Sequence, residues 1–389
     1  MDKIRNIAVL GSTGSIGRQT LDVITEYPDK FKAWLLVANT SADLLIEQSL
    51  KYKPHAVVIG DERYFHQVKE ALAGTGIAVY TGHSAIANLV ASPEVDTIVT
   101  AMVGYSGLES TIAGIEAGKT IALANKETLV VAGELICEKL KTSKSVLYPV
   151  DSEHGAFYQC LVGENSNDVD KLILTASGGP FRKTDIAELA KVTAADALKH
   201  PNWNMGAKIT IDSASMMNKG FEMIEAKWLF GISHENIEIV VHPQSIVHSM
   251  VQFKDGSVKA QLGLPDMRLP IRYALGMPDG RLASESKKMS LADYATLTFE
   301  KPDFKKFPLL DAAYEAARRG GNIACAMNAA NEIAVAAFLN GSIGFNDIYK
   351  TVERTMNWVT FIEKPTYADY VECNRESRQY AETLIKNLN

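Results

Sequence analysis

The sequence has few cysteines and no long apolar run. Its 389 residues include four cysteines, Cys137, Cys160, Cys325 and Cys373, which lie far apart and share no CxxC or Cys/His zinc spacing. We expect them to be reduced, mostly buried thiols of a cytoplasmic protein. No uninterrupted apolar run approaches the roughly 18 residues of a membrane span, so we expect no membrane partner.

Basic tracts are also missing. A net charge of −6 without a cluster of Lys or Arg argues against a nucleic-acid partner. Residues 1–10 predict a strand that enters a glycine turn, which is unlike a signal or transit peptide. With 47% apolar and 22% charged residues, the composition is globular, and 389 residues predict two or three domains.

The amino-terminal third begins with a strand, a glycine turn and a helix. Residues 7–10 predict the strand, and Gly11, Gly14 and Gly17 form a GxxGxxG turn. The following helix is predicted by the spacing of Ile16, Thr20, Val23 and Tyr27 before Pro28. In this order the glycines let the backbone approach a pyrophosphate at the helix amino terminus, which favours dinucleotide binding over a purely structural turn.

The second strand, residues 33–38, ends in Asn39, Thr40 and Ser41. An NAD enzyme typically places an acid there for the ribose 2′-hydroxyl. Because these three residues are neutral donors, we prefer NADP to NAD. No lysine or arginine occurs between positions 32 and 51, however, so the turn itself offers no charge to a 2′-phosphate.

Four further strands complete a mostly parallel, doubly wound sheet. They are predicted at residues 56–59, 77–80, 97–100 and 120–123. Two loops, residues 101–104 and 124–127, follow strand ends and should lie over the cofactor. Lys126 is the cation of these loops, and a functional role and an ordinary place at a helix start are equally consistent with its spacing.

Two carboxylates follow the next apolar run. If residues 146–150 form a buried strand, its period of two places Asp151 and Glu153 on one face past the carboxyl end. Convergent carboxylates suit a hard divalent cation such as Mg²⁺ or Mn²⁺. Taken alone, an Asp-x-Glu pattern is more often a solvated strand end.

The middle of the chain carries two unusual loops. A strand at residues 171–174 leads into a glycine-rich loop at 175–181, which either approaches a ligand or is a plain turn. Residues 200–206, with Trp203 among polar residues, have the composition of a lid that closes over a site. The alternative is a tryptophan that anchors this loop onto the core.

Residues 208–212 predict a strand, after which Ser213 can cap a helix over 214–230. Ser215, Asn218 and Glu222 would share one face of that helix. Hydroxyl, amide and Lys219 groups near a helix start suit a phosphate, and Glu222 could give a metal its third carboxylate. A solvated helix face would explain Lys219 and Glu222 equally well.

The carboxyl-terminal part predicts a second sheet, a linker and a helical bundle. The strands are expected at residues 237–241, 245–253 and 258–262, with a hairpin turn at 255–256, and the helices at 309–319, 324–340, 346–360 and 367–388. The stretch 278–308 is rich in Pro, Lys, Ser and Asp and marks a linker. We interpret Asn328, Asn331 and Glu332 of the bundle as structural.

Several motifs together resemble one enzyme family. GSTGSIG, NKE at 125–127, DSE at 151–153, SGGPF, HPNWNMGAKITIDSASMMNKGFE and HPQSIVHSMV are similar, in this order, to 1-deoxy-D-xylulose 5-phosphate reductoisomerases. The resemblance covers nearly the whole chain, and the block at 200–222 is highly specific. It implies NADPH- and metal-dependent (Mn²⁺, Mg²⁺ or Co²⁺) rearrangement and reduction of that sugar phosphate to 2-C-methyl-D-erythritol 4-phosphate, in non-mevalonate isoprenoid biosynthesis.

The resemblance also implies roles for individual residues. The metal ligands would be Asp151, Glu153 and Glu222. Catalytic roles would fall to Lys126, Glu153 and His200. The substrate would contact Lys126, Ser152, Glu153, Ser177, His200, Trp203, Ser213, Asn218, Lys219 and Glu222, with Met205 in the closing loop. The cofactor would contact Thr13, Gly14, Ser15, Ile16, Asn39, Thr40, Ser41, Asn125, Glu127 and Gly206. Relatives often have a basic residue at 39–41, where this chain has none.

The resemblance also implies an α/β fold and a homodimer. The expected parts are a Rossmann-like doubly wound NADPH-binding domain at 1–150, a central α/β catalytic, metal and dimerising-sheet domain at 151–285 with a lid near 200–207, a linker at 286–308 and a C-terminal helical bundle at 309–389. As a hypothesis, the ion stabilises oxyanion charge while the carbon skeleton rearranges, Glu153 or metal-bound water moves protons, and Lys126 stabilises an oxygen.

Two other functions fit parts of the sequence. A semialdehyde dehydrogenase would need a cysteine nucleophile in a turn, and none of the four cysteines has that context. A non-catalytic dinucleotide-sensing module should need neither a metal nor a lid. NADPH oxidation with and without EDTA, with either 1-deoxyxylulose phosphate or aspartate semialdehyde as the substrate, distinguishes these alternatives.

Overall fold

The chain is described from a computed structural model, over residues 3–200, 203 and 205–387. Contacts divide it into two compact units, each assembled from separate stretches of sequence. The first unit comprises residues 1–128, 136–155 and 266–285, and the second comprises residues 129–135, 156–265 and 286–389.

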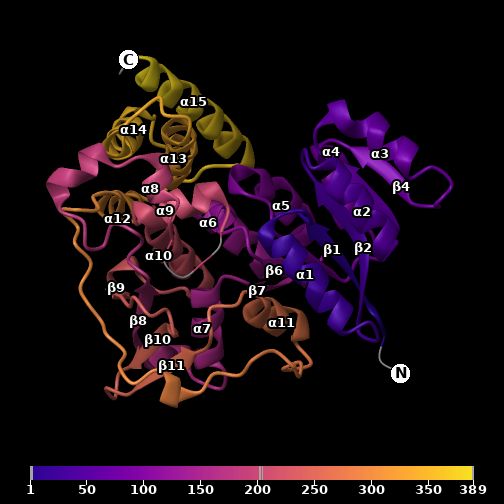
Figure 1. Cartoon of the computed structure of the whole chain (residues 1–389), viewed down its shortest axis with the longest axis horizontal. Helices are drawn as coiled ribbons and strands as arrows, with labels where there is room; N and C mark the ends of the chain where they lie inside the picture. Colours follow the sequence, from indigo (N-terminus) through magenta and orange to yellow (C-terminus); the bar gives the residue numbers. More distant parts are fainter. Residues whose placement is uncertain (1–2, 201–202, 204, 388–389) are drawn as a thin grey trace. The chain divides into compact units, whose positions relative to one another are not determined.

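A seven-stranded parallel sheet forms the core of the first unit, with the strand order β4-β3-β2-β1-β5-β6-β7 (Figure 1). Its strands are β1 (Arg5–Leu10), β2 (Phe31–Ala38), β3 (Ala56–Ile59), β4 (Ala78–Thr81), β5 (Thr97–Thr100), β6 (Thr120–Leu123) and β7 (Val146–Pro149). The central strands contain buried apolar runs, such as Ile7–Leu10 of β1 and Ala33–Ala38 of β2, as expected when helices cover both faces. This confirms the predicted doubly wound sheet.

Helices connect the strands of this sheet. They are α1 (Ser15–Glu26), α2 (Ala42–Tyr52), α3 (Phe65–Ala71), α4 (His83–Val90), α5 (Leu108–Glu116) and α6 (Glu127–Thr142), with the short 3-10 turns η1 (Glu62–Tyr64) and η2 (Gly104–Gly107). A later helix, α11 (Arg268–Gly276), returns to this unit and packs against α1, β6 and β7.

The strand order reverses between β1 and β5, which are hydrogen-bonded neighbours. The loops after these two strands therefore emerge side by side, with the Ala101 N–H donating to Leu10 O at 2.8 Å. A switch point of this kind is where open α/β sheets bind their ligands, beyond the carboxyl ends of the strands. The glycine turn at 11–17 follows β1 at this switch point.

The second unit contains a four-stranded mixed sheet in the order β11-β10-β8-β9. Its strands are β8 (Val169–Ala176), β9 (Ile237–Val241), β10 (Val247–Phe253) and β11 (Val258–Leu262). β8 and β9 are parallel, and the other neighbours are antiparallel. The predicted hairpin turn between β10 and β11 is confirmed, because Gly256 has φ +87° and its N–H donates to Phe253 O.

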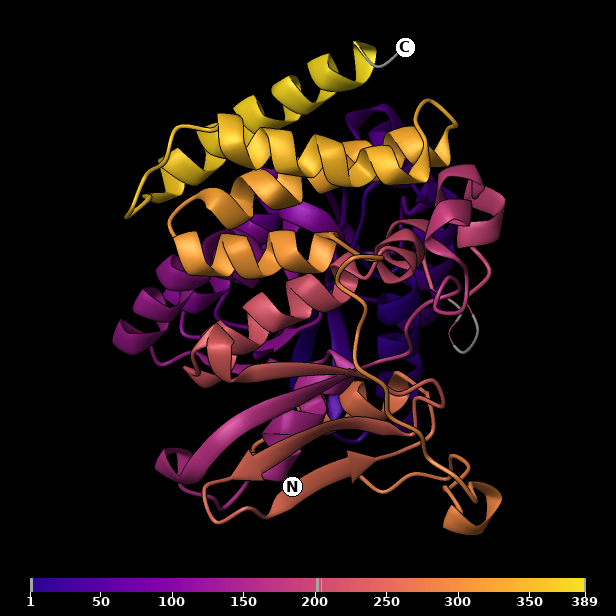
Figure 2. The ribbon, with the colours of Figure 1, turned by 90° about the vertical axis from the view of Figure 1, so that its left-hand side faces the viewer.

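The described part of the second unit also contains helices. They are α7 (Ser152–Leu161), which begins in the first unit, α8 (Ala194–Ala197), α9 (Ala207–Ala214), α10 (Met217–Phe230), α12 (Leu309–Arg319), α13 (Ile323–Leu339), α14 (Phe345–Trp358) and α15 (Tyr367–Lys386), with the 3-10 turns η3 (Ser166–Asp168), η4 (Ile186–Lys191), η5 (His234–Asn236) and η6 (Leu291–Asp293). Helix α10 packs on β8 and β9 and, on its other side, on α12. Figure 2 shows α12 to α15, drawn in orange and yellow, stacked as the predicted helical bundle.

One predicted strand is wrong. Residues 208–212 belong to helix α9, and Ser213 lies in its last turn, so it does not cap the next helix. Helix α10 instead begins after Met216, which has a left-handed backbone with φ +63°. Ser215 therefore lies outside α10 and does not extend the face of Asn218 and Glu222, as the sequence had predicted.

Among the described residues, no helix is both long and apolar enough to cross a bilayer.

Candidate active site

In the glycine turn after β1, Gly11 and Gly17 are closely packed, whereas Gly14 is exposed. A Cβ on Gly11 would lie 2.5 Å from Ala101 O, and one on Gly17 would lie 2.2 Å from Gly11 O. Gly14 is exposed and caps α1 without a side-chain hydrogen bond. The first N–H groups of α1 are thus open to an anion.

The predicted cofactor residues of the first unit follow three strand ends. Thr13, Ser15 and Ile16 belong to the glycine turn and the start of α1, and all three are partly exposed. Asn39, Thr40 and Ser41 follow β2 and are exposed. Asn125 and Glu127 follow β6 and are buried.

Asn125 links two loops. Its amide donates to Gly104 O and to the Glu127 carboxylate, both at 3.0 Å, and its oxygen accepts from the Thr128 hydroxyl. A Cβ on Gly107 would lie 2.3 Å from that oxygen, so the loop after β5 rests directly on Asn125. The side chain fixes the loop geometry above β5 and β6, which is a role that the sequence did not reveal.

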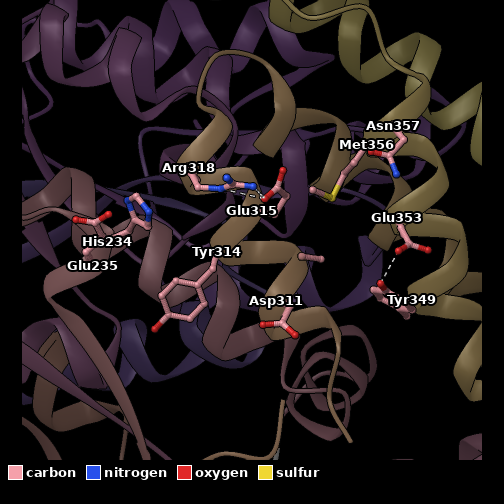
Figure 3. A pocket seen from close by; sticks show the side chains of 11 residues that line it. His234, Glu235, Asp311, Tyr314, Glu315, Arg318, Tyr349, Glu353, Met356 and Asn357 are labelled. Carbon is pink, nitrogen blue, oxygen red and sulfur yellow. Dashed lines mark hydrogen bonds and ion pairs between the residues drawn. The ribbon is translucent and has the colours of Figure 1, made fainter. Parts of the chain in front are cut away.

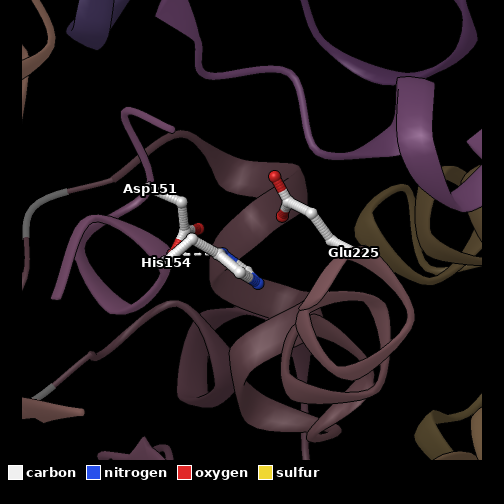
Figure 4. A group of neighbouring side chains, drawn as sticks. All are labelled: Asp151, His154 and Glu225. Atoms are coloured by element: carbon white, nitrogen blue, oxygen red, sulfur yellow. Dashed lines mark ion pairs between the residues drawn. The ribbon is translucent and has the colours of Figure 1, made fainter. Parts of the chain in front are cut away.

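Lys126, Asp151 and His154 form a buried charged cluster in the first unit. Lys126 Nζ lies 2.7 Å from Asp151 Oδ2, and His154 Nδ1 lies 3.1 Å from Asp151 Oδ1. The Asp151–His154 pair is drawn in Figure 4. Because both side chains of the Lys126–Asp151 pair are less than a tenth exposed, Lys126 is not an ordinary solvated lysine at a helix start.

The two carboxylates after β7 are placed by a helix start, not by a strand. β7 ends at Pro149, and the Asp151 carboxylate accepts the Glu153 N–H at 3.1 Å, as a residue preceding a helix does. Glu153 lies in the first turn of α7 beside Ser152, whose hydroxyl donates to it. The predicted convergence of the two acids is confirmed, since an oxygen of each carboxylate lies within 4.8 Å of the other. The reason given for it was wrong, because the start of α7 and not the period of a strand brings them together.

In the second unit, Ser177 lies between His200 and a glycine loop. Its Oγ is 3.1 Å from His200 Nε2 and accepts the Gly179 N–H at 3.2 Å. Gly178 and Gly179 both have positive φ, and a Cβ on Gly179 would lie 2.5 Å from Ser213 O. The loop therefore packs onto the end of α9, which brings Ser177 near Ser213.

His200 is a neutral donor in this arrangement. Burial lowers its pKa to about 4, so the ring carries one proton at neutral pH. Nδ1 accepts the Trp203 N–H at 3.0 Å, which leaves the proton on Nε2, facing Ser177. Ser177 Oγ accepts from this proton, and its own hydroxyl hydrogen remains available to a ligand.

Glu222 and Lys219 are buried, contrary to the solvated-face alternative. Glu222 is 1% exposed and Lys219 is 4% exposed. The Glu222 carboxylate accepts from the Lys219 ammonium and from the Asn218 amide, both on the same helix. Burying these charges costs desolvation free energy, and proteins often keep such buried charged groups at functional sites. This turn of α10 is therefore a candidate site.

The predicted lid is described only in part. Trp203 and Met205 are half-buried, the Trp203 ring centre lies 6.5 Å from that of His248, and Gly206 is the exposed residue before α9. Pro201, Asn202 and Asn204 lie outside the described residues. The lid function therefore stays a prediction.

A separate open pocket of about 610 Å³ lies in the second unit, near α12 and α14 (Figure 3). It is lined by His234, Glu235, Asp311, Ala312, Tyr314, Glu315, Arg318, Tyr349, Glu353, Met356 and Asn357. None of the residues predicted for the active site lines it. We therefore give it no part in catalysis.

Comparison with known proteins gives consistent matches along the chain. The family model of 1-deoxy-D-xylulose 5-phosphate reductoisomerase matches residues 7–133. The model of the 1-deoxy-D-xylulose 5-phosphate reductoisomerase C-terminal domain matches residues 147–230, and the model of the DXP reductoisomerase C-terminal domain matches residues 262–380. Proteins of that name from Bacteroides thetaiotaomicron and Bacteroides fragilis are 56% and 55% identical, covering 99% and 98% of this chain and 98% of each relative.

Solved structures agree with these matches. The reductoisomerase of Zymomonas mobilis in complex with NADPH is 43% identical, with a TM-score of 0.91, over 98% of this chain and 99% of that one. A DOX-P reductoisomerase in complex with NADPH, fosmidomycin and magnesium is 37% identical, with a TM-score of 0.95, over 99% of both chains.

Proposed function

The chain belongs to the 1-deoxy-D-xylulose 5-phosphate reductoisomerase family, and on this premise we propose which of its residues carry the reaction. It is an NADPH- and divalent-metal-dependent oxidoreductase that converts 1-deoxy-D-xylulose 5-phosphate to 2-C-methyl-D-erythritol 4-phosphate, a step of non-mevalonate isoprenoid biosynthesis. The proposal rests above all on the buried Glu222 carboxylate.

Asp151 and Glu153 of the first unit and Glu222 of the second would hold the divalent cation. Each offers a carboxylate oxygen, which is the ligand that hard cations such as Mg²⁺ and Mn²⁺ prefer, and Co²⁺ also accepts. When bound, the ion supplies Lewis-acid stabilisation of negative charge on the ketone and hydroxyl oxygens of the sugar. The donor set therefore fits the metal that the family needs.

The phosphate of the substrate would bind in the second unit. Lys219 supplies a positive charge, while Ser177, Ser213 and Asn218 supply neutral donors. His200 keeps the Ser177 hydroxyl oriented by donating to its oxygen, so that the serine hydrogen points to the phosphate. Binding energy gained at the phosphate can orient the reacting carbons.

Lys126, Ser152 and Glu153 would act at the sugar oxygens. The Lys126 ammonium is held by Asp151 and can donate a hydrogen bond to an oxygen that gains charge. Glu153 would move a proton to or from a hydroxyl group. Trp203 and Met205 would belong to the loop that excludes water.

NADPH would lie on the first unit. Its pyrophosphate takes the open amino terminus of α1, at Thr13, Gly14, Ser15 and Ile16. Asn39, Thr40 and Ser41 would contact the adenosine end. Asn125, Glu127 and, from the second unit, Gly206 complete the predicted set of cofactor contacts.

Glu222→Gln tests the proposal. The variant should lose metal-dependent turnover by roughly a hundredfold or more and should bind Mn²⁺ more weakly, because a ligand loses its charge. NADPH affinity, measured by fluorescence titration, should change little. Unchanged turnover would remove Glu222 from the ligand set.

Two controls accompany this variant. Glu382→Gln alters an exposed glutamate of α15 and should leave turnover and metal affinity unchanged. Because Glu222→Gln leaves the buried Lys219 charge without its carboxylate, unfolding in urea must confirm that the variant is folded under assay conditions.

We also propose the four-part division at residues 150, 285 and 308, a homodimer and a cytoplasmic location. The dimer is supported by β11, which is an outer strand of its sheet and has Val258 exposed, so it can pair with its own copy across a two-fold axis. A solution mass equal to one chain of 42.5 kDa would contradict it. The four free cysteines suit a reducing compartment.

A further inference from the structure

The turns that follow β2 and β3 lie against each other. The two strands are parallel neighbours, with Ala38 opposite Ile59. Their pairing continues beyond the strands, because the Gly60 N–H donates to Ala38 O at 2.8 Å and the Asp61 N–H donates to Asn39 O at 3.0 Å. A Cβ on Gly60 would lie 2.6 Å from Asn39 Oδ1, so the Asn39 side chain rests on the neighbouring turn.

Arg63 is held in this second turn by Asp61. Its Nε lies 3.0 Å from both carboxylate oxygens of Asp61, and its Nη2 lies 2.5 Å from Oδ2. The Arg63 N–H also donates to Oδ1 at 3.0 Å. A guanidinium has five N–H donors, and this fork occupies the Nε donor and one Nη2 donor. The remaining donors are free for a second anion, since the Arg63 side chain is 80% exposed.

Arg63 is a basic residue beyond the carboxyl end of β3, where the turn at 39–41 also lies. Residues 39–68 contain two further cations, Lys51 and Lys53, which lie in the last turn and at the carboxyl end of α2. An eleven-residue helix is roughly 16 Å long, so both are far from its amino end at Ser41. Arg63 instead follows β3 on the same edge as the turn at 39–41.

We propose that Arg63, oriented by Asp61, binds the 2′-phosphate of NADPH together with Asn39, Thr40 and Ser41, and so sets the preference for NADPH over NADH. The inference rests on the proposed NADPH site. The positive charge that binds the phosphate then comes from the turn after β3, because the turn after β2 has no basic residue. Planar guanidinium groups bind phosphate through two parallel hydrogen bonds, which a neutral turn cannot replace.

The neighbouring acids make this role specific. Asp61, Glu62 and Asp43 all lie in or beside the two turns, and Asp43 accepts a hydrogen bond from Gln67 at 2.6 Å. Without the guanidinium, the local charge would repel a phosphate dianion. Loss of Arg63 should therefore weaken NADPH binding and spare NADH binding.

Fluorescence titration of the full chain with NADPH and with NADH tests this, without substrate or metal. Arg63→Ala should raise the Kd for NADPH roughly tenfold or more and the Kd for NADH less than about twofold. Arg63→Lys should recover part of the loss, because it keeps the charge but not the fork. Lys32→Ala, which removes an exposed cation at the opposite end of β2, should change neither Kd.

Adenosine 2′,5′-bisphosphate and adenosine 5′-monophosphate differ by the 2′-phosphate. Used as competitors of NADPH, they show whether Arg63 binds that phosphate. Only the bisphosphate should lose affinity in Arg63→Ala. An unchanged NADPH to NADH ratio, or equal weakening of both fragments, would overturn the role of Arg63 while leaving the NADPH site in place. Failure of the wild-type chain to bind NADPH would contradict the proposed function itself.

Discussion

At the residue scale, the protonation of His200 is set by its surroundings. Burial lowers its pKa to about 4, and Trp203 and Ser177 together select the tautomer with the proton on Nε2. A charged imidazole would donate from both nitrogens and would lose the hydrogen bond from the Trp203 N–H. The neutral ring therefore holds Ser177 and Trp203 at once.

His200 should keep this neutral tautomer from about pH 8 to about pH 5. Long-range ¹H–¹⁵N spectra of ¹⁵N-labelled protein report the state of each ring nitrogen, and His200→Gln assigns the signal. A titration midpoint near the ordinary value of 6.5 would contradict the buried, neutral ring.

The same shift makes stability depend on pH. Between about 6.5 and about 4 the unfolded chain binds a proton at His200 that the folded chain does not, so stability falls as the pH falls through this window. Urea unfolding at both ends of the window should show a smaller loss for His200→Gln than for the wild type. An equal loss would exclude this linkage.

At the scale of elements, prediction succeeded for short, buried strands between turns and for long helical repeats, and it failed for one short alternating stretch. The strands of the first sheet were found as apolar runs, and helices α12 to α15 were found from the repeated spacing of their buried residues. Residues 208–212 alternate Ile and Thr, as a strand does, yet they form α9, where buried Thr210, Ile211 and Ala214 have helical spacing. Five residues cannot distinguish the two periods, and tertiary packing decides.

A polar contact that the sequence did not indicate ties helix α9 to the bundle. Asn331 of α13 donates to Asp212 Oδ1 at 2.8 Å, and Lys208 Nζ lies 2.8 Å from Asp212 Oδ2. Asp212 is 1% exposed and Asn331 is fully buried. The expected structural role of Asn331 agrees with this contact, which positions the helix that carries Ser213.

Asn331→Ala should lower the free energy of unfolding by about 1–3 kcal/mol, because it removes one partner of a buried carboxylate. Urea unfolding followed by circular dichroism measures the change. Asn357→Ala, at an exposed position of α14, is the matched control and should change stability by about 0.5 kcal/mol or less. Equal effects of the two variants would mean that the Asp212 contact contributes nothing.

Two substitutions in the glycine turn distinguish its role in packing from its role in ligand binding. Gly17→Ala should destabilise the first unit, because its Cβ would lie 2.2 Å from Gly11 O. Gly14 has φ −74°, and a Cβ there would meet only Gly11 O, at 3.4 Å, so Gly14→Ala should fold normally. It should nevertheless weaken NADPH binding roughly tenfold, because the methyl group would enter the space proposed for the pyrophosphate. Normal NADPH affinity in Gly14→Ala would move the pyrophosphate away from this turn.

At the scale of the whole molecule, the sequence indicated the fold class, the family and the reaction, but not how distant segments assemble. Helix α11 returns to the first unit after more than a hundred residues in the second, and its packing on α1 is a tertiary contact that no local pattern encodes. The burial of Lys126, Lys219 and Glu222 was equally hidden, since charged residues are usually solvated.

The assignment of charge around the cofactor illustrates the same limit. The sequence showed that the turn after β2 lacks a basic residue. It could not show that Arg63, more than twenty residues later, follows the neighbouring strand of the same sheet, because strand order is a property of the assembled unit.

The central claim is that Asp151, Glu153 and Glu222 share one divalent ion. Crystals grown with NADPH and Mn²⁺, with diffraction data collected at the manganese absorption edge, test it most directly. The account predicts one anomalous peak bonded to an oxygen of each carboxylate at about 2.0–2.6 Å. A peak bonded elsewhere, or one that leaves out any of the three carboxylates, would contradict it.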